Sequence, residues 1–221
     1  MKRGFSLIEL MVVVIIIGIV AALAIPTMAV ARFDREAYSD AGSIMMLFRE
    51  ARMRAISRGG AVLLAMSSSG KGDRGTFSMY EAVAPNAGGV GLARTPLASC
   101  KAPTIWTPLA STNTNVLLVE GVDLNNAGST TALEVEADIE TQMFVYPDPT
   151  NNTPVAYNLG YVCYTPLGHA YINTGSASTP VFDGILPAIS PLVVRVTRLG
   201  GGNVRDVVVP PNGMARLFSH T

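Results

Sequence analysis

The feature that most constrains this chain is an apolar run close to its start. Phe5–Ile25 comprises 21 consecutive residues, and Glu9 is the only charged residue among them. As an α-helix this run is about 32 Å long, which matches the hydrocarbon thickness of a bilayer. Lys2 and Arg3 precede it, and basic residues ahead of a span favour a cytoplasmic amino end with the remainder exported. The run therefore predicts a transmembrane helix over residues 5–25.

Two simpler interpretations of this run are a cleaved secretory signal and a plain membrane anchor. Ala22-Leu23-Ala24 resembles a signal-peptidase site. The run is longer, however, than the usual apolar region of about 7–15 residues, and Pro26 would lie just past the cut. Glu9 argues against both interpretations, because an unpaired carboxylate within an inserted helix costs about 2.5–3.5 kcal/mol.

The composition excludes several function classes. Sixteen basic residues balance 16 acidic ones among 221 residues, so nucleic acid is not expected as a partner. Two histidines and two cysteines show no nucleophile–base or metal-ligand spacing, which predicts a non-enzymatic protein without metal or cofactor. Asp148 and Asn151–Thr153 offer oxygen atoms of the kind Ca²⁺ prefers, but their spacing is irregular and no metal site is predicted from them.

Beyond Pro26 the helical pattern continues with a single apolar stripe. Gly59-Gly60 is a signal for its end. Gly18 and Pro26 are the weak points, because glycine loosens a helix and proline removes one of its backbone hydrogen bonds. We therefore expect residues 26–59 to form an amphipathic continuation of the apolar helix. Its stripe repeats at steps of three and four at Val30, Phe33, Ala37, Ala41, Ile44, Phe48, Ala51 and Ala55.

The first residues carry a family resemblance. Gly4-Phe5-Ser6-Leu7-Ile8-Glu9-Leu10, followed by a Val/Ile run, resembles the leader of type IV pilins and type II secretion pseudopilins. The resemblance implies that prepilin peptidase cleaves between Gly4 and Phe5, so residues 1–4 form a leader peptide. It also implies that the new terminus at Phe5 is N-methylated. The cut precedes the apolar run, which then stays in the mature protein.

The resemblance also implies a role for Glu9 in assembly. Cleavage leaves an ammonium group on Phe5 within a bundle of apolar helices, where a charge has to be paired or neutralised. In the family, the carboxylate at this position pairs with the terminal amine of a neighbouring subunit and sets the axial register. The alternative is a Glu9 carboxyl group that is simply protonated in the membrane.

Three further segments resemble the GspH/FimT group of minor pilins and pseudopilins. They are residues 48–59 at the helix end, the turn Tyr164–Ala170, and the stretch Val204–Arg216 that ends in a Gly-x-x-Arg turn. This resemblance implies an α+β pilin fold with a long amino-terminal helix on antiparallel sheets. Residues 60–221 are then a periplasmic β-rich domain, in which 84–159 has no match to the family pattern and is expected to be an insertion.

After Gly60 the sequence changes to short β-type runs separated by turn residues. Gly200–Asn203 predicts a hairpin between the last two runs. Residues 84–114 and 147–159 are rich in turn formers and are expected to be surface loops. The expected strands are Ala61–Met66, Thr76–Val83, Asn115–Val119, Leu133–Glu136, Met143–Tyr146, Gly160–Tyr164, Leu192–Leu199 and Arg205–Val209.

Cys100 and Cys163 are the only cysteines. In an exported domain they meet an oxidising compartment, which favours a disulfide between them. Closing this loop of about 63 residues contributes at most about 4 kcal/mol in the chain-entropy model. Two unpaired buried thiols are the alternative.

Charge is distributed unevenly along the chain. Arg49, Arg52, Arg54 and Arg58 crowd the end of the helix, either as a solvated terminus or as a docking face for an acidic neighbour. Between Ala102 and Val194 there is no Lys or Arg, although acidic residues recur there. This asymmetry either reflects complementarity within the molecule or orients neighbouring subunits.

The leading hypothesis from the sequence is a minor pilin that helps form the priming complex at the tip of a type IV pilus. The alternatives are an H-type minor pseudopilin of a type II secretion system and a membrane-anchored periplasmic binding domain. The expected partners are other minor pilins or pseudopilins, the major pilin, prepilin peptidase, the inner-membrane assembly platform and a tip adhesin. The expected location is the inner membrane, with a single pass and a periplasmic domain, and then the pilus or pseudopilus.

Overall fold

The structure is a computed structural model of the chain. Within the amino-terminal helix, the side chains of residues 23–30 and 32–33 are not described. The described residues are 7–69, 72–84, 94–101, 105–109, 113–125, 139–145, 155–174, 180–182, 190–198 and 202–220.

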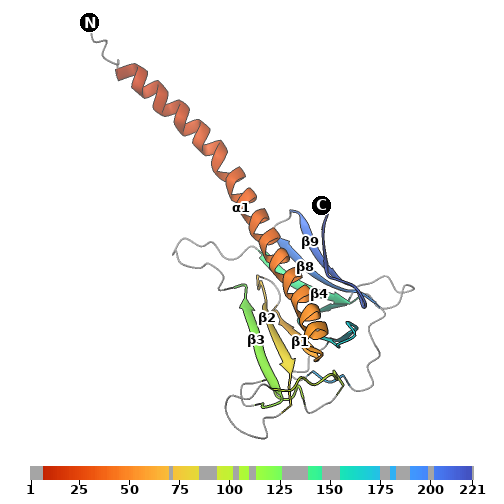
Figure 1. The fold of residues 1–221 in the computed structure, drawn as a ribbon. Coiled ribbons are helices and arrows are strands. Elements are labelled where there is room, and N and C mark those ends of the chain that lie inside the picture. Colours follow the sequence, from red (N-terminus) through yellow and green to blue (C-terminus); the bar gives the residue numbers. More distant parts are fainter. Residues whose placement is uncertain are drawn as a thin grey trace.

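One long helix and two antiparallel sheets make up the described chain (Figure 1). The helix α1 is continuous from Leu7 to Arg58 and projects far beyond the sheets at its amino end. Gly59 follows it with φ +66°, a left-handed conformation that glycine adopts without strain and that commonly ends helices. This arrangement confirms the predicted α+β class.

The first sheet contains five strands in the order β3-β2-β1-β6-β7, all antiparallel. A β-bulge interrupts the pairing of β2 with β3 at Met79/Tyr80. The strands are β1 Val62–Ser67, β2 Thr76–Ala82, β3 Val116–Asp123, β6 Leu159–Tyr164 and β7 Ala170–Thr174.

The second sheet also contains five strands, in the order β10-β9-β8-β4-β5. The pairing of β8 with β9 confirms the hairpin predicted around Gly200–Asn203. The strands are β4 Ile139–Val145, β5 Val155–Tyr157, β8 Leu192–Arg198, β9 Val204–Val209 and β10 Arg216–His220.

The sequence located most strands but not all of them. Seven of the predicted runs overlap observed strands, although β3 and β4 are each four residues longer on one side than predicted. The eighth run, Leu133–Glu136, lies outside the described residues. The expectation of loop throughout 147–159 is wrong, because β5 occupies Val155–Tyr157 and pairs with β4. The sequence also missed β7 and β10.

The main core lies where the carboxyl-terminal half of α1 packs on both sheets. The six stripe positions from Ala37 to Ala55 are at most 2% exposed, which confirms the predicted buried face. Four of the six are alanines, whose small side chains let the sheets approach the helix closely. They meet alternate residues of the strands, such as Leu64 from β1, Val162 from β6 and Val194 from β8.

A smaller core covers the opposite face of the first sheet. Leu63 and Cys163 point away from α1 into this core, and the segment that contains Trp106 covers them. Cys100 and Cys163 form a disulfide with a Cα–Cα distance of 6.0 Å, and the Trp106 Nε1–H donates to the Cys100 carbonyl oxygen at 3.0 Å. The disulfide thus ties Cys100 to β6, and the hydrogen bond ties Trp106 to Cys100.

Three ion pairs at two buried acids, Asp40 and Glu81, join α1 to the first sheet and its loops. Arg74 donates from Nε and Nη2 to the two carboxylate oxygens of Asp40, each at 2.8 Å. Burial raises the pKa of Asp40 although Arg74 opposes that shift. Near the helix end, Arg54 and Arg58 contact the fully buried Glu81 of β2 at 3.1 Å and 2.6 Å.

The other two arginines of the helix end hold the turns of both sheets. Arg49 Nε–H donates to the Ala215 carbonyl oxygen at 2.9 Å. Arg52 donates to the carbonyl oxygens of Gly168, at 3.2 Å, and Asn212, at 3.3 Å. We call these three hydrogen bonds the arginine clamp.

The clamp corrects the two sequence-based interpretations of the arginines. All four, including Arg54 and Arg58 at Glu81, are engaged within the molecule, so the cluster is neither a merely solvated helix end nor a free docking face. Backbone carbonyl groups from residues distant in the sequence are partners that a charge pattern does not reveal.

We expect the clamp to contribute measurably to stability. Arg52→Ala removes two hydrogen bonds from a charged donor and should lower the free energy of unfolding by about 1–2 kcal/mol, discounted for partial exposure. Gly168→Ala should cost about 1–3 kcal/mol, because Gly168 has φ +77° and an added Cβ would lie 2.9 Å from Arg52 Nη2. Denaturant titration of the full chain in detergent, followed by the fluorescence of its single tryptophan, measures both changes.

Arg35→Ala is the matched control for the clamp variants. Arg35 lies on the same helix but is exposed, so its removal should change the free energy of unfolding by less than about 0.5 kcal/mol. Equal losses for Arg35→Ala and Arg52→Ala would show that the clamp contributes nothing specific.

The disulfide should form in the exported protein and stabilise the domain. Peptide mapping without reductant should recover Cys100 joined to Cys163. The double variant Cys100→Ser/Cys163→Ser should unfold at lower denaturant concentration, with a loss of up to about 4 kcal/mol. Recovery of both cysteines as free thiols from unreduced protein would contradict this expectation.

Candidate assembly site

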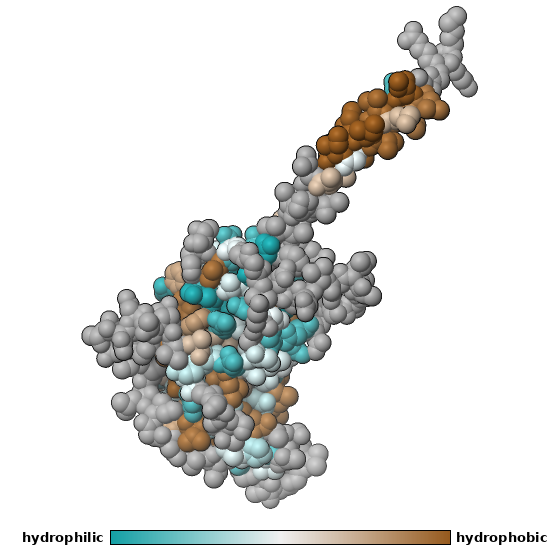
Figure 2. All heavy atoms as spheres, turned by 180° about the vertical axis from the view of Figure 1, so that it is seen from behind, coloured by the Kyte–Doolittle hydropathy of each residue, from teal (hydrophilic) through white to brown (hydrophobic). Residues whose placement is uncertain are grey.

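The amino-terminal part of α1 stands clear of the sheets and is almost entirely apolar (Figure 2). We call its described side chains, residues 7–22, the stem. The large aliphatic side chains from Leu7 to Val20 are each between 45% and 76% exposed. Burying such a side chain is worth about 1.5–3 kcal/mol, so a free stem in water is strongly disfavoured. The stem therefore requires an apolar environment supplied from outside this chain.

Glu9 is the one acidic residue of the stem, and it lies in the first turn of α1. It is exposed, and no described residue forms an ion pair with it. Acidic groups are favoured near helix amino termini by the helix dipole. In an apolar environment the carboxylate additionally needs a cation or a proton, because an unpaired buried charge is costly.

The described part of the chain contains no helical stretch with the length and apolarity that a membrane span requires. The predicted span, residues 5–25, includes Phe5 and Ser6 and the side chains of residues 23–25, which lie outside the described set. Gly4 and Phe5, the predicted processing site, also lie outside it.

The two predicted weak points of the helix lie within its continuous backbone. α1 runs through both Gly18 and Pro26 without an interruption. A Cβ added at Gly18 would have no atom within 4 Å, so an intramolecular contact does not explain this glycine. Their roles as weak points stay predictions.

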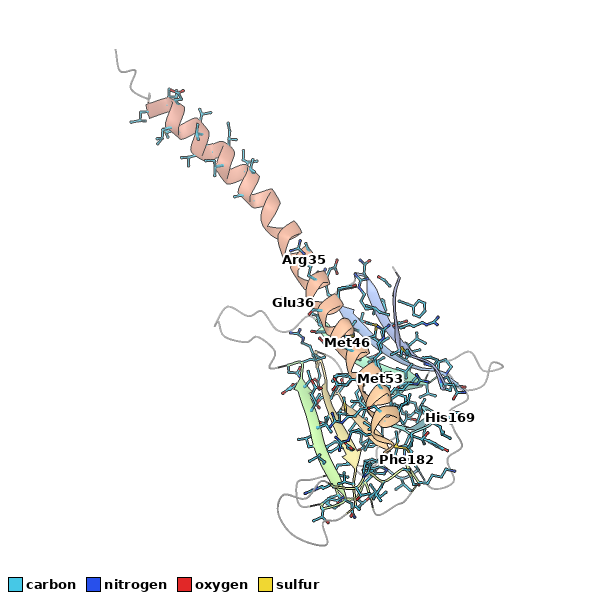
Figure 3. The ribbon with its side chains drawn as sticks, viewed as in Figure 1. Arg35, Glu36, Met46, Met53, His169 and Phe182 are labelled. Atoms are coloured by element: carbon cyan, nitrogen blue, oxygen red, sulfur yellow. A yellow bond between two sulfur atoms is a disulfide. The ribbon has the colours of Figure 1, made fainter. Side chains whose placement is uncertain are left out.

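The stem continues into a half of α1 that is anchored to the domain. Its helix continues into the buried half, where Asp40–Arg74, the Glu81 ion pairs and the arginine clamp fix it at successive levels. Figure 3 shows His169 close to the carboxyl-terminal end of α1, and its Nδ1 lies 2.7 Å from Asn212 Oδ1. This contact joins the two turns that the clamp holds.

The clamp is the part of the site that sequence reasoning missed. The helix end, the turn at Gly168 and the stretch around Gly213 each carried a family resemblance, but nothing in their separate patterns indicated that they meet. Their shared likeness to one group of proteins was the available signal. In the structure the three segments meet, since Arg52 donates to a carbonyl oxygen from each turn.

Among the described residues, both cysteines and His169 are engaged within the fold. No group of three or more His, Cys, Asp or Glu residues gathers as metal ligands within the described ranges. Both cysteines are in the disulfide, and His169 bonds to an amide oxygen rather than to a nucleophile. The described residues present an apolar stem with one carboxylate, continuous with the half of α1 that packs on the sheets.

Comparison with known proteins agrees with this geometry at the amino terminus. The prokaryotic N-terminal methylation motif matches residues 1–25. No curated protein and no solved structure matches the chain. The motif implies processing by a prepilin peptidase, an N-terminal membrane anchor and assembly with other pilins. It therefore supports a type IV pilin-like protein with a structural, non-enzymatic role.

Proposed function

We propose that this protein is a minor pilin that helps form the priming complex from which a type IV pilus grows. The observation that carries the proposal is the exposed apolar stem with Glu9 as its one acid, within a matched methylation motif. In this proposal residues 1–4 are removed, residues 5–25 cross the inner membrane, and residues 60–221 form a periplasmic domain. The stem later leaves the lipid and packs against the stems of other subunits.

The structure supports the assignment to the GspH/FimT group in one respect. The three segments that resemble this group lie together at the arginine clamp, so the likeness concerns one connected structural feature. H-type pseudopilins of type II secretion systems belong to the same group and use the same stem chemistry. Neighbouring genes distinguish the two, since pilus minor pilins and an adhesin accompany one, and a secretion ATPase and secretin accompany the other.

Processing is the first test of this proposal. Intact-mass analysis of protein extracted from membranes should show loss of Met1–Gly4 and the addition of one methyl group at Phe5. Cleavage after Gly4 lies before the apolar run, so the whole stem stays in the mature protein and is available for assembly. A mature chain that begins at Ile25 would instead show a conventional secretory signal.

Replacement of Glu9 tests the assembly role. Glu9→Ala should leave export and cleavage after Gly4 intact but prevent stable association with partner pilins. Removing one member of a buried ion pair costs about 3–5 kcal/mol. Glu9→Asp should be intermediate, because it keeps the charge but shortens its reach. Co-purification of the processed variants with other minor pilins, together with a count of surface pili, measures the effect.

Met11→Ala is the matched control, since it shortens an exposed stem side chain without removing charge. It should co-purify with partners nearly as well as the unmodified protein. If Glu9→Ala protein assembles as well as the Met11→Ala control, the ion pair does not direct assembly, and a passive membrane-anchored domain becomes the better interpretation.

A further inference from the structure

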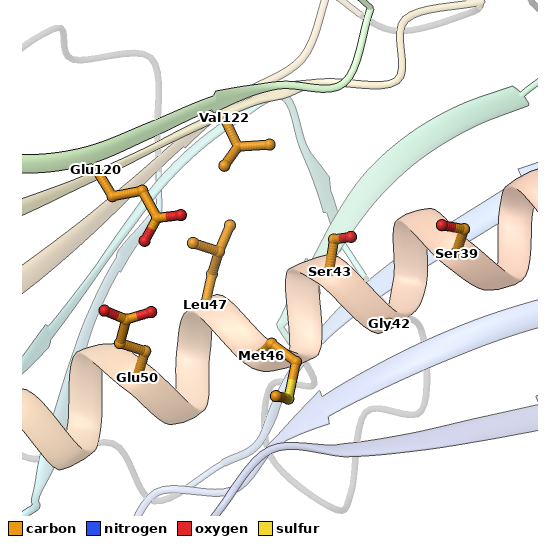
Figure 4. A pocket seen from close by; sticks show the side chains of 8 residues that line it. All are labelled: Ser39, Gly42, Ser43, Met46, Leu47, Glu50, Glu120 and Val122. Atoms are coloured by element: carbon orange, nitrogen blue, oxygen red, sulfur yellow. The ribbon is translucent and has the colours of Figure 1, made fainter. Parts of the chain in front are cut away.

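A groove runs between α1 and the edge strand β3 (Figure 4). Its volume is about 450 Å³. The residues that define its chemistry are Ser43, Met46, Leu47 and Glu50 from α1, and Glu120 and Val122 from β3.

The groove combines an apolar floor with two opposed carboxylates. Leu47 and Val122 form the floor, and Met46, 61% exposed, lies on the rim. Figure 4 shows the Glu50 and Glu120 side chains extending toward one another from the two walls. Two carboxylates in this arrangement repel each other and together favour a cation between them.

The described part of this chain supplies no such cation. The three acids that are buried against the core each have an arginine partner: Asp40 has Arg74, Glu81 has Arg54 and Arg58, and Asp206 has Arg195. No ion pair joins Glu50 or Glu120 to any described residue.

The surroundings of Glu50 and Glu120 explain why neither carboxylate has a described basic partner. Arg54 is four residues after Glu50, the spacing at which helical ion pairs form, but its guanidinium group is directed to Glu81. Glu120 lies in the segment from Ala102 to Val194, which contains no Lys or Arg. No Lys or Arg among the described residues therefore pairs with either carboxylate.

We propose that this groove docks a cationic segment of a different pilin-like subunit, with an arginine or lysine placed between Glu50 and Glu120. An aliphatic side chain next to that residue would cover Leu47 and Val122. Arginine and lysine suit such a site because their aliphatic stems lie on apolar surface while the charged group reaches the carboxylates. The inference rests on the proposed function, because it names the chemistry of one partner in the assembly.

Photocrosslinking in cells that make the full chain tests this proposal. Met46 is replaced by p-benzoyl-phenylalanine, and the captured peptide is identified by mass spectrometry. It should come from a different pilin-like subunit and contain Lys or Arg beside an aliphatic residue. Adding Glu50→Gln and Glu120→Gln should lower the crosslinking yield about tenfold, because the partner's cation then loses both carboxylates.

Glu140→Gln is the matched control, because Glu140 of β4 also lacks an ion pair with the described residues but lies on the other sheet. It should leave the yield unchanged. Replacing the basic residue of the captured peptide with an acidic one should lower the crosslinking yield, and Glu50→Lys in this chain should restore it. Unchanged tryptophan fluorescence and disulfide content in all variants would show that the domain remains folded.

Other outcomes would overturn the inference. A captured peptide without Lys or Arg, capture of a second copy of this chain, or a yield that depends on Ca²⁺ rather than on the partner's cation would each do so. A second photocrosslinker at Ile15 in the stem separates the two proposals. If Ile15 crosslinks to other pilins but Met46 does not capture a basic peptide, only the groove proposal is rejected. If neither position crosslinks to another pilin, the proposed function is rejected as well.

Discussion

One continuous helix has to satisfy two different environments, and the rest of the structure follows from that constraint. The carboxyl-terminal half of α1 buries a stripe of mostly alanine side chains against two sheets. Its amino-terminal half exposes aliphatic side chains that only lipid or other apolar helices can cover. No loop separates the halves, so the stem extends directly from the half that packs on the sheets.

Much of this organisation was predictable from local patterns. The stripe from Ala37 to Ala55 follows from its spacing, and Gly59 marks the helix end through its positive φ. The three strands that were missed, β5, β7 and β10, all lie at sheet edges. Short edge strands are stabilised by their neighbours more than by their own residues, so they carry a weak local pattern.

The candidate site was only partly predictable, for a related reason. The methylation motif and Glu9 are contiguous in the sequence and are visible without a structure. The clamp joins Arg49 to Ala215 and Arg52 to Gly168, residues separated by 166 and 116 positions. Backbone carbonyl acceptors cannot be predicted from residue type, since every residue has one. The groove likewise requires the juxtaposition of Glu50 and Glu120, which only the packing of β3 beside the helix creates.

Because α1 is continuous, the number of residues between Glu9 and Glu50 determines how the domain is rotated relative to the stem. Each residue of an α-helix advances the direction of its side chain by about 100°. Inserting or deleting one residue between the stem and Ala37, where the buried stripe begins, would turn the domain by about that angle about the helix axis relative to the stem. The stem side chains could still be buried, but the domain would face another direction in the assembly. The length of this interval therefore encodes the azimuth of the subunit, independently of which apolar residues occupy it.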